Sequence, residues 1–205
     1  HLVDAVIALP LNVFYGAGVP ACLVILKRDR PKLRKEKVLL IYAARHYRDL
    51  SAQNELRPQD EMRILVHYHA YGEAGRVSDL VEQHATRMRG VITHREEEEV
   101  ARLVAEFELH AAKHTELGRE RDKILAKLKP LKSNADRKPI ETALNKLTRA
   151  IKKTGSKLAE RDERIAERRR RAEEDRADVT KVGEELTTLY STPGDLIKHA
   201  RVVDM

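Results

Sequence analysis

The chain has 205 residues, which allows one or two domains. Aromatic residues make up only 4% of it and tryptophan is absent, so a large globular core is not expected, whereas 36% charged residues favour long helices with solvated surfaces. The formal net charge of +7 favours an acidic partner such as nucleic acid, although a charged helix surface without a ligand is the commoner cause of such an excess.

Cysteine usage and hydropathy bound the class of protein further. Cys22 is the single cysteine, which excludes an internal disulfide and a multi-cysteine metal site and fits a reducing cytoplasm. No apolar run approaches the length needed to span a bilayer, so no membrane partner is expected. The chain begins with His1 and enters a strand almost at once, which predicts that it is a piece of a longer protein.

The first predicted elements are short strands. Asp4–Leu9 and Ala21–Lys27 are apolar runs bounded by proline and glycine, and Val38–Tyr42 is a third such run. The loop between the first two places Phe14 beside Tyr15, and a loop that carries large apolar side chains usually contacts a ligand or partner. Three strands do not make a complete domain, so we expect them to form the edge of a larger sheet.

Two shorter helices are predicted next. The first begins at Pro58, a residue that suits the first helical turn, and ends at Gly72. Ser78 caps a second helix that stops at Gly90.

Two long helices account for most of the remaining chain. Thr93 and Glu96 form a capping box at the start of the first. Pro130 and Pro139 bracket a polar turn, after which a heptad repeat of apolar residues continues for about fifty residues. The loop geometry predicts that the two helices fold back on each other as an antiparallel coiled-coil hairpin.

Folding this hairpin about Asn134 places Leu117 near Ile151 and Val104 near Ile165. The second helix outruns the first, because at about 1.5 Å per residue it is the longer of the two. Its last apolar residues therefore must pack against the globular part of the same chain or against a partner subunit; they are Val179, Val182, Leu186 and Leu189. The short segment from residue 194 to 205 is expected to be a capping tail.

Charged residues interrupt the apolar seam of the hairpin. Arg161, Arg168 and Asp175 fall on seam positions, which predicts a loosely packed or wet section there. A run of four arginines is a candidate nucleic-acid-binding patch that would touch phosphates without sequence preference, with a solvated face as the alternative. The run consists of Arg168, Arg169, Arg170 and Arg171.

Two other patterns are weaker. His110 and His114 are spaced to hold a metal, but no glutamate lies between them as in a zinc-protease helix, and His114 falls on the hairpin seam, so we predict a structural role and no metal site. The Gly16-Ala17-Gly18 segment precedes a strand, whereas a dinucleotide-binding glycine loop opens a helix, so we reject that function.

Residues 6–27, VIALPLNVFYGAGVPACLVILK, resemble the late sheet region of DNA adenine-N6 methyltransferases. The pattern is most similar to the methylation subunit of prokaryotic type I restriction-modification systems, where the leucine-proline pair, the asparagine, the Phe-Tyr pair and the small-residue turn recur together. The resemblance continues through KVLLIYAARHYRD and QNELRPQDEMRILVHYHAYG to about residue 72. After residue 72 the resemblance is limited to the presence of long helices, with which these subunits also end.

The resemblance and the element pattern together predict an α+β fragment, mostly α. The closing strands of a Rossmann-like methyltransferase sheet would be followed by the long antiparallel helical hairpin, a coiled coil. The predicted parts are the C-terminal part of a methyltransferase domain at 1–72, a connector with a short helix at 73–93, a hairpin for subunit assembly at 94–190 and a tail at 191–205.

The resemblance also implies a substrate-binding loop. In these enzymes the loop after the leucine-proline strand lies beside the pocket for the target base, and Phe14 matches the aromatic that stacks on the extruded adenine. A flat apolar face replaces the stacking that a base loses when it leaves the duplex. Tyr15 and Asn12 are further candidates, Asn12 also as a residue that shapes the turn. The alternative for Phe14 is that it only plugs the end of the sheet.

The implied reaction is methyl transfer from S-adenosylmethionine to adenine N6 in DNA by the full-length parent. The family's Asn/Asp-Pro-Pro-aromatic motif and its glycine-rich cofactor loop are absent from this sequence, so we expect this chain alone to be inactive and to bind no cofactor. The implied partners are DNA and the specificity and restriction subunits of the same system. The alternatives are a non-enzymatic coiled-coil scaffold and a basic coiled-coil nucleic-acid-binding module.

Overall fold

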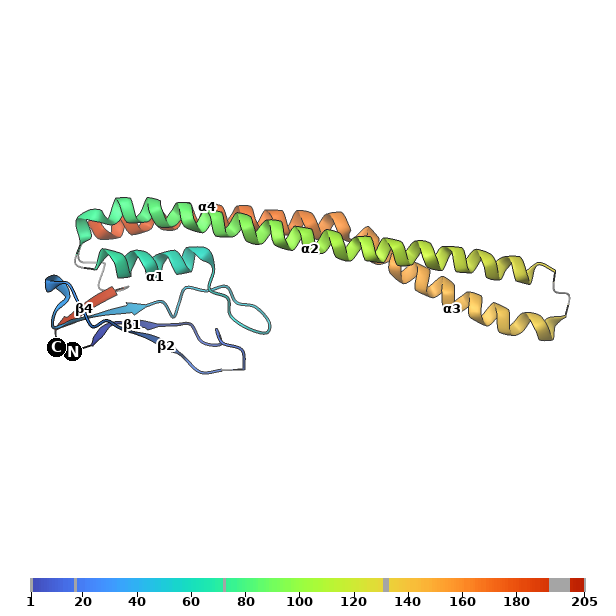
Figure 1. Ribbon diagram of the computed structural model, residues 1–205, viewed down its shortest axis with the longest axis horizontal. Helices are drawn as coiled ribbons and strands as arrows, with labels where there is room; N and C mark the ends of the chain where they lie inside the picture. The colour runs from blue at the N-terminus through green and yellow to red at the C-terminus, as the bar shows by residue number, and fades with distance from the viewer. Residues whose placement is uncertain (1, 17, 72, 131–132, 192–199, 205) are drawn as a thin grey trace. The chain divides into compact units, whose positions relative to one another are not determined.

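The computed structural model describes residues 2–16, 18–71, 73–130, 133–191 and 200–204 (Figure 1). In chain order the elements are β1 (Val3–Ala8), β2 (Cys22–Leu26), β3 (Lys37–Tyr42), α1 (Pro58–Ala70), α2 (Val77–Leu128), α3 (Asn134–Ala159), α4 (Arg161–Ser191) and β4 (Ala200–Asp204). This arrangement confirms the predicted α+β class with a large excess of helix. Within the described ranges, no helix has both the length and the apolar character that crossing a membrane requires.

The chain divides into two compact units. Unit 1 comprises His1–His94 and Ala172–Met205, and unit 2 comprises Arg95–Arg171. Both α2 and α4 contribute residues to each unit. The four parts predicted from the sequence remain predictions.

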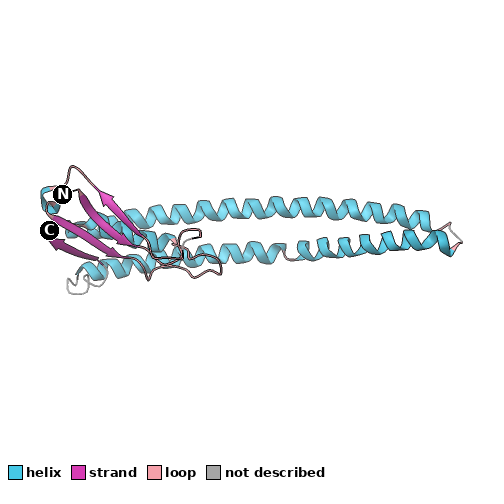
Figure 2. Cartoon of the chain, turned by 90° about the horizontal axis from the view of Figure 1, so that it is seen from below, coloured by secondary structure: helices cyan, strands magenta, loops and turns pink. Residues whose placement is uncertain are grey.

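Unit 1 contains a four-stranded sheet with the strand order β2-β1-β3-β4 (Figure 2). β1 pairs antiparallel with β2 and parallel with β3, so that Ile7 lies opposite both Leu23 and Ile41. The three predicted strands are confirmed to within one residue at either end. β4, antiparallel to β3, lies in what was expected to be only a capping tail, and residues 192–199 and 205 of that region are outside the described residues.

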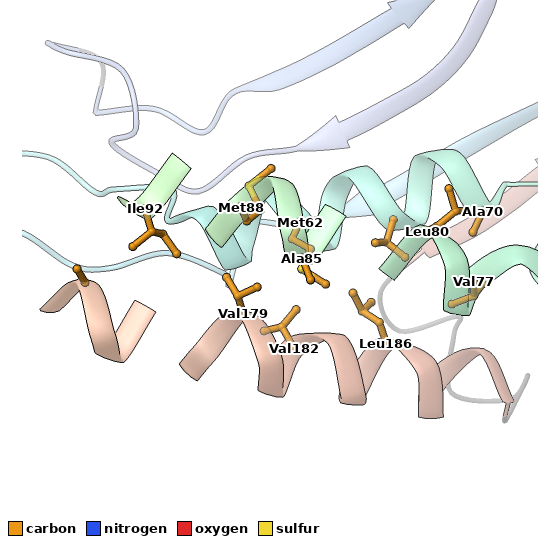
Figure 3. Packing of buried hydrophobic residues seen from close by; sticks show 12 residues of the cluster. Met62, Ala70, Val77, Leu80, Ala85, Met88, Ile92, Val179, Val182 and Leu186 are labelled. Atoms are coloured by element: carbon orange, nitrogen blue, oxygen red, sulfur yellow. The ribbon is translucent and has the colours of Figure 1, made fainter. Parts of the chain in front are cut away.

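Three helical segments form the main apolar core of unit 1 (Figure 3). α1, the first part of α2 and the last part of α4 bring together Met62, Val66, Ala70, Val77, Leu80, Ala85, Met88, Ile92, Ala172, Val179, Val182 and Leu186. Gly183 is buried here, and a Cβ atom on it would lie 3.0 Å from a methyl group of Val81. Val179, Val182 and Leu186 of α4 therefore pack against the globular part of the same chain, one of the two destinations that the sequence left open, while Leu189 is half-buried outside this cluster.

The helix break predicted at Gly90 is wrong, and so is the helix start predicted at Thr93. α2 runs through both residues, and the Thr93 hydroxyl donates to the Arg89 carbonyl one turn back at 3.0 Å, as inside a helix. A glycine inside a helix costs about 1 kcal/mol. The buried side chains of Met88 and Ile92 on either side supply the packing that offsets this cost.

The second long helix differs from its prediction in two ways. It begins at Asn134, so Pro139 lies inside α3 rather than at the end of the turn. As the sixth residue of α3, Pro139 offers no N–H to the Ala135 carbonyl and its ring crowds that carbonyl, which weakens the first turns of the helix. The helix also ends at Ala159, and the Glu160 N–H bonds to the Leu158 carbonyl before α4 begins.

Contacts within unit 2 follow the predicted register. His114 Nδ1 lies 2.9 Å from Thr154 Oγ1, and Arg164 Nη1 lies 3.5 Å from Glu106 Oε1. Of the charged residues on the seam, Arg168 pairs with Glu99 and Arg161 is exposed, so the loosely packed or wet section stays a prediction.

Asp175, the third charged residue on the predicted seam, lies in unit 1. Its carboxylate accepts hydrogen bonds from Arg48 Nη2 at 2.7 Å and Gln59 Nε2 at 3.3 Å. Gln59 also donates to Asp178 at 3.1 Å. These bonds tie α4 to the start of α1 and to the irregular segment before it.

A pair of histidines joins α1 to α2. His69 Nδ1 lies 2.8 Å from His84 Nε2, and the two rings stack with centroids 5.0 Å apart. Burial lowers the pKa of both imidazoles below the ordinary 6.5. Positive charge lowers each pKa further. At His69 this charge comes from Arg34 and Arg87. At His84 it comes from His69 and Arg87. The folded chain therefore prefers the pair neutral.

We expect this preference to make stability depend on pH. Because the pKa values are lower in the folded chain, the unfolded chain binds more protons below about pH 6.5, so the free energy of unfolding should fall as the pH drops from there. Urea unfolding between pH 7.5 and 5 should show a shallower fall for a His69→Gln/His84→Gln variant than for wild type. Parallel slopes for wild type and the double variant would exclude the pair as the cause.

Candidate functional site

The connection between β1 and β2, residues 9–21, is here called the aromatic loop. It leaves the sheet through Leu9 and Pro10, which are both buried. Two residues then turn the chain with positive φ angles, Asn12 at 56° and Gly16 at 73°. Asparagine and glycine are the residues that adopt this left-handed conformation most readily. The loop therefore has a defined turn at its base.

A second segment, Ala52–Asn54, holds the base of the aromatic loop from about forty residues away. The Asn54 backbone N–H donates to the Asn12 carbonyl at 2.9 Å, and its side-chain amide donates to the Leu11 carbonyl at 2.8 Å. Gln53 Nε2 donates to the Val13 carbonyl. Asn12 Nδ2 donates in return to the Ala52 carbonyl at 3.4 Å. This clamp fixes the backbone on which the aromatic side chains stand.

The apolar side chains of the clamped loop point into solvent. Phe14 is 49% exposed and Tyr15 is 94% exposed. Leu11 and Val19 are also exposed, so the loop presents a small apolar surface around Phe14. Such a surface, with an aromatic ring on a fixed backbone, is suited to stacking on a flat apolar ligand.

Asn12 and Tyr15, the other residues predicted to bind the substrate, differ in their exposure and in their contacts within the protein. Asn12 is half-buried and uses its amide nitrogen within the protein, which gives it a part in shaping the turn. Tyr15 stands beyond Phe14 with almost its whole surface available. Phe14, Tyr15 and Asn12 thus lie on one loop, and their role towards a substrate stays a prediction.

The arginine run on α4 is largely engaged with carboxylates. Arg168 pairs with Glu99, while Arg170 Nε and Arg171 Nε lie 3.1 and 2.8 Å from the two oxygens of Glu167. Hydrogen bonds from Arg170, and then from Arg171, hold the pKa of Glu167 below its ordinary value. Arg169 is exposed. The run therefore has less positive charge to offer a phosphate than its sequence suggests.

Sequence reasoning missed a buried ionic cluster around Asp4, in β1. Its carboxylate is fully buried and lies 3.3 Å from Arg30 Nε, 3.6 Å from Arg34 Nη1 and 2.9 Å from the Tyr68 hydroxyl. Arg34 also donates to the Tyr71 carbonyl at 2.9 Å, next to the C-terminus of α1. Burial and the nearby Asp4 carboxylate raise the pKa of Tyr68. The cluster fixes β1 to α1, and an aspartate at the start of an apolar strand was its only signal.

Comparison with known proteins gives one family. The sequence signature of the family described as N-6 DNA Methylase matches residues 1–111, more than half of the chain. This range includes the sheet strands β1 to β3, the aromatic loop and its clamp.

Individual relatives agree with that match. The chain is similar to the type I restriction enzyme MjaIX methylase subunit of Methanocaldococcus jannaschii, with 26% identity over 82 residues, covering 40% of this chain and 15% of that protein. The MjaVIII methylase subunit of the same organism is 39% identical over 46 residues, covering 22% and 8%.

A solved structure, the type I restriction-modification methyltransferase subunit of Streptococcus thermophilus, is 30% identical over 34% of this chain and 14% of that one, with a TM-score of 0.31. The matched regions thus span 15% or less of each of these three proteins. The resemblance read from residues 6–27 is confirmed: the chain belongs to the N-6 DNA methylase family.

Proposed function

We propose that this chain is the C-terminal part of the methylation subunit of a type I restriction-modification system. In this proposal the full-length protein transfers a methyl group from S-adenosylmethionine to N6 of adenine in DNA. The aromatic loop forms one wall of the pocket that receives the adenine. The restriction and specificity subunits of the same system are the proposed protein partners, with α2, α3 and α4 serving assembly.

The observation that carries the proposal is the exposed aromatic pair on a clamped loop. Exposing Phe14 and Tyr15 to water costs free energy, because burying apolar surface contributes about 25 cal/mol per Å². Gln53 and Asn54 fix the backbone of that loop through their side-chain amides, which holds the two rings in place for a ligand. An extruded base offers the flat face that such rings accept.

The sheet supports the same proposal. Among the described residues β2 is one of the two edge strands of the sheet, with β4 at the other edge, and the apolar side chains Leu23, Val24 and Leu26 of β2 are 47 to 64% exposed. An unpaired apolar strand edge attracts further strands. We propose that the remaining strands of a Rossmann-like methyltransferase sheet pair with β2 in the full-length protein.

The residues of this chain do not include the family's cofactor loop or its Asn/Asp-Pro-Pro-aromatic motif. S-adenosylmethionine would supply the methyl group, and no residue of this chain is assigned to hold it. The part proposed for this chain is to stack on the target base through Phe14, to cover the base through Tyr15 and to keep the loop in shape through Asn12. The chain alone is expected to transfer no methyl group.

The position of the methyl group tests the proposed reaction. The full-length protein, assembled with its specificity subunit, is incubated with duplex DNA and S-adenosylmethionine labelled in the methyl group, and the DNA is digested to nucleosides. We expect the label in N6-methyladenine and none with the 205-residue chain alone. Label in a cytosine derivative, or none with the assembled protein, would contradict the proposal.

A further inference from the structure

α3 has one apolar side and one basic side. Its apolar residues recur with helical spacing and are half-buried within unit 2; they are Ile140, Leu144, Leu147, Ile151 and Leu158. At 100° per residue, the opposite side of the helix carries only polar residues from Lys138 onward, apart from Pro139 in the second turn. They are Lys138, Thr142, Asn145, Lys146, Arg149, Lys152, Lys153, Ser156 and Lys157, here called the basic stripe, and every one is exposed.

The charges of the basic stripe are not balanced by carboxylates. α3 contains seven lysines and arginines but only Asp136 and Glu141 as acids, and Glu141 pairs with Arg137, outside the stripe. Among the described residues, none of the six stripe cations lies within ion-pair distance of an acidic side chain. Lys157 Nζ lies 3.4 Å from His110 Nε2, a contact with a ring nitrogen rather than with a carboxylate.

This separates the stripe from the arginine run of α4. Arg170 and Arg171 share the carboxylate of Glu167, and Arg168 pairs with Glu99. The stripe cations therefore offer more uncompensated positive charge than the arginines that the sequence singled out.

We propose that the basic stripe of α3 binds the phosphate backbone of double-stranded DNA. Phosphate contacts in protein–DNA complexes come from lysine, arginine, serine, threonine and asparagine, which are the residue types of the stripe. A protein partner would need apolar or aromatic anchors at the centre of its interface, and the stripe has none. From Lys138 to Lys157 the stripe is about 28 Å long, which equals roughly eight base pairs of duplex.

Binding of this kind needs no sequence recognition. The stripe would hold DNA against unit 2 through charge alone, and its affinity would fall with salt as counterions return to the phosphates. The inference goes beyond the proposed methyl transfer and is tested without it, so either can fail while the other stands.

The test measures salt-dependent binding of the 205-residue chain to a fluorescent 30-base-pair duplex of arbitrary sequence. The stripe variant combines Arg149→Gln, Lys153→Gln and Lys157→Gln. The matched control removes the same charge from the arginine run with Arg169→Gln, Arg170→Gln and Arg171→Gln. Circular dichroism melts establish that both variants are folded.

We expect the stripe variant to bind roughly tenfold more weakly at low salt, and the slope of log K against log salt concentration to shrink by about 3. The control should keep most of the wild-type affinity and slope. Equal losses in both variants, or a larger loss in the control, would overturn the proposal.

Two further measurements keep the test decisive. If the triple variant does not fold, the pair Lys146→Gln and Lys152→Gln replaces it, with an expected slope change of about 2. Poly-glutamate of equal charge is the competitor for an acidic protein partner. Failure of poly-glutamate to displace the duplex supports DNA as the partner, and displacement as effective as by unlabelled duplex contradicts it.

Discussion

Replacing Phe14 with alanine in the full-length protein should lower kcat/KM for methyl transfer by about 10- to 100-fold while binding of S-adenosylmethionine stays unchanged. The size follows from base–aromatic stacking, which contributes about 1–3 kcal/mol per base. The loss arises because an adenine outside the duplex would no longer find an aromatic face. Initial rates of labelled methyl incorporation, with cofactor binding by calorimetry, give the two quantities.

Two control variants separate stacking from loop damage. Phe14→Trp keeps an aromatic face and should retain most of the rate, whereas Val19→Ala removes a more exposed apolar side chain of the same loop and should have little effect. Turnover that is unchanged in Phe14→Ala, or lost equally in Val19→Ala, would remove the stacking role.

Leu186→Asp should abolish the cooperative unfolding transition of unit 1. Leu186 has no exposed surface and lies in the core that α1, α2 and α4 share. Truncating such a leucine to alanine costs about 3–5 kcal/mol, and a buried unpaired carboxylate costs more. Domains are stable by only about 5–15 kcal/mol, so the substitution should leave little folded core. Urea titrations followed by circular dichroism measure the change.

Leu189 provides the matched control three residues further along α4. It is half-buried, so Leu189→Asp should cost clearly less than Leu186→Asp. A Leu186→Asp protein that melts like wild type would show that this part of α4 does not contribute to the core.

The strands and the hairpin register could be predicted because each depends on local pattern. Short apolar runs ending at Pro10 and Lys27 mark β1 and β2, and folding the hairpin about Asn134 gives the register in which His114 lies against Thr154. The helix boundaries around Gly90 and Pro139 could not, because their local signals compete with packing that the sequence does not show. β4 was missed because its five residues pair with β3 from more than 150 positions away.

In the candidate site, too, features with a local sequence pattern could be predicted and contacts between distant residues could not. The sequence pointed to Phe14 through its neighbours and a family resemblance, and to the loop through its glycines. Nothing in the sequence indicates that Gln53 and Asn54 clamp that loop, and only an aspartate at the start of an apolar strand indicates the cluster of Arg30 and Arg34 around Asp4. These contacts join residues that are distant in the chain. The pairing of Arg170 and Arg171 with Glu167 also changed which basic surface is available to phosphates.

Photo-cross-linking measures whether Phe14 faces the target base. A duplex carrying 5-iodouracil at the target adenine position is irradiated with the full-length protein and its specificity subunit, and the cross-linked peptide is sequenced by mass spectrometry. We expect a cross-link at Phe14 or Tyr15 that is lost when the iodouracil is moved three base pairs away. A cross-link elsewhere in the protein, or one that persists after this move, would contradict it.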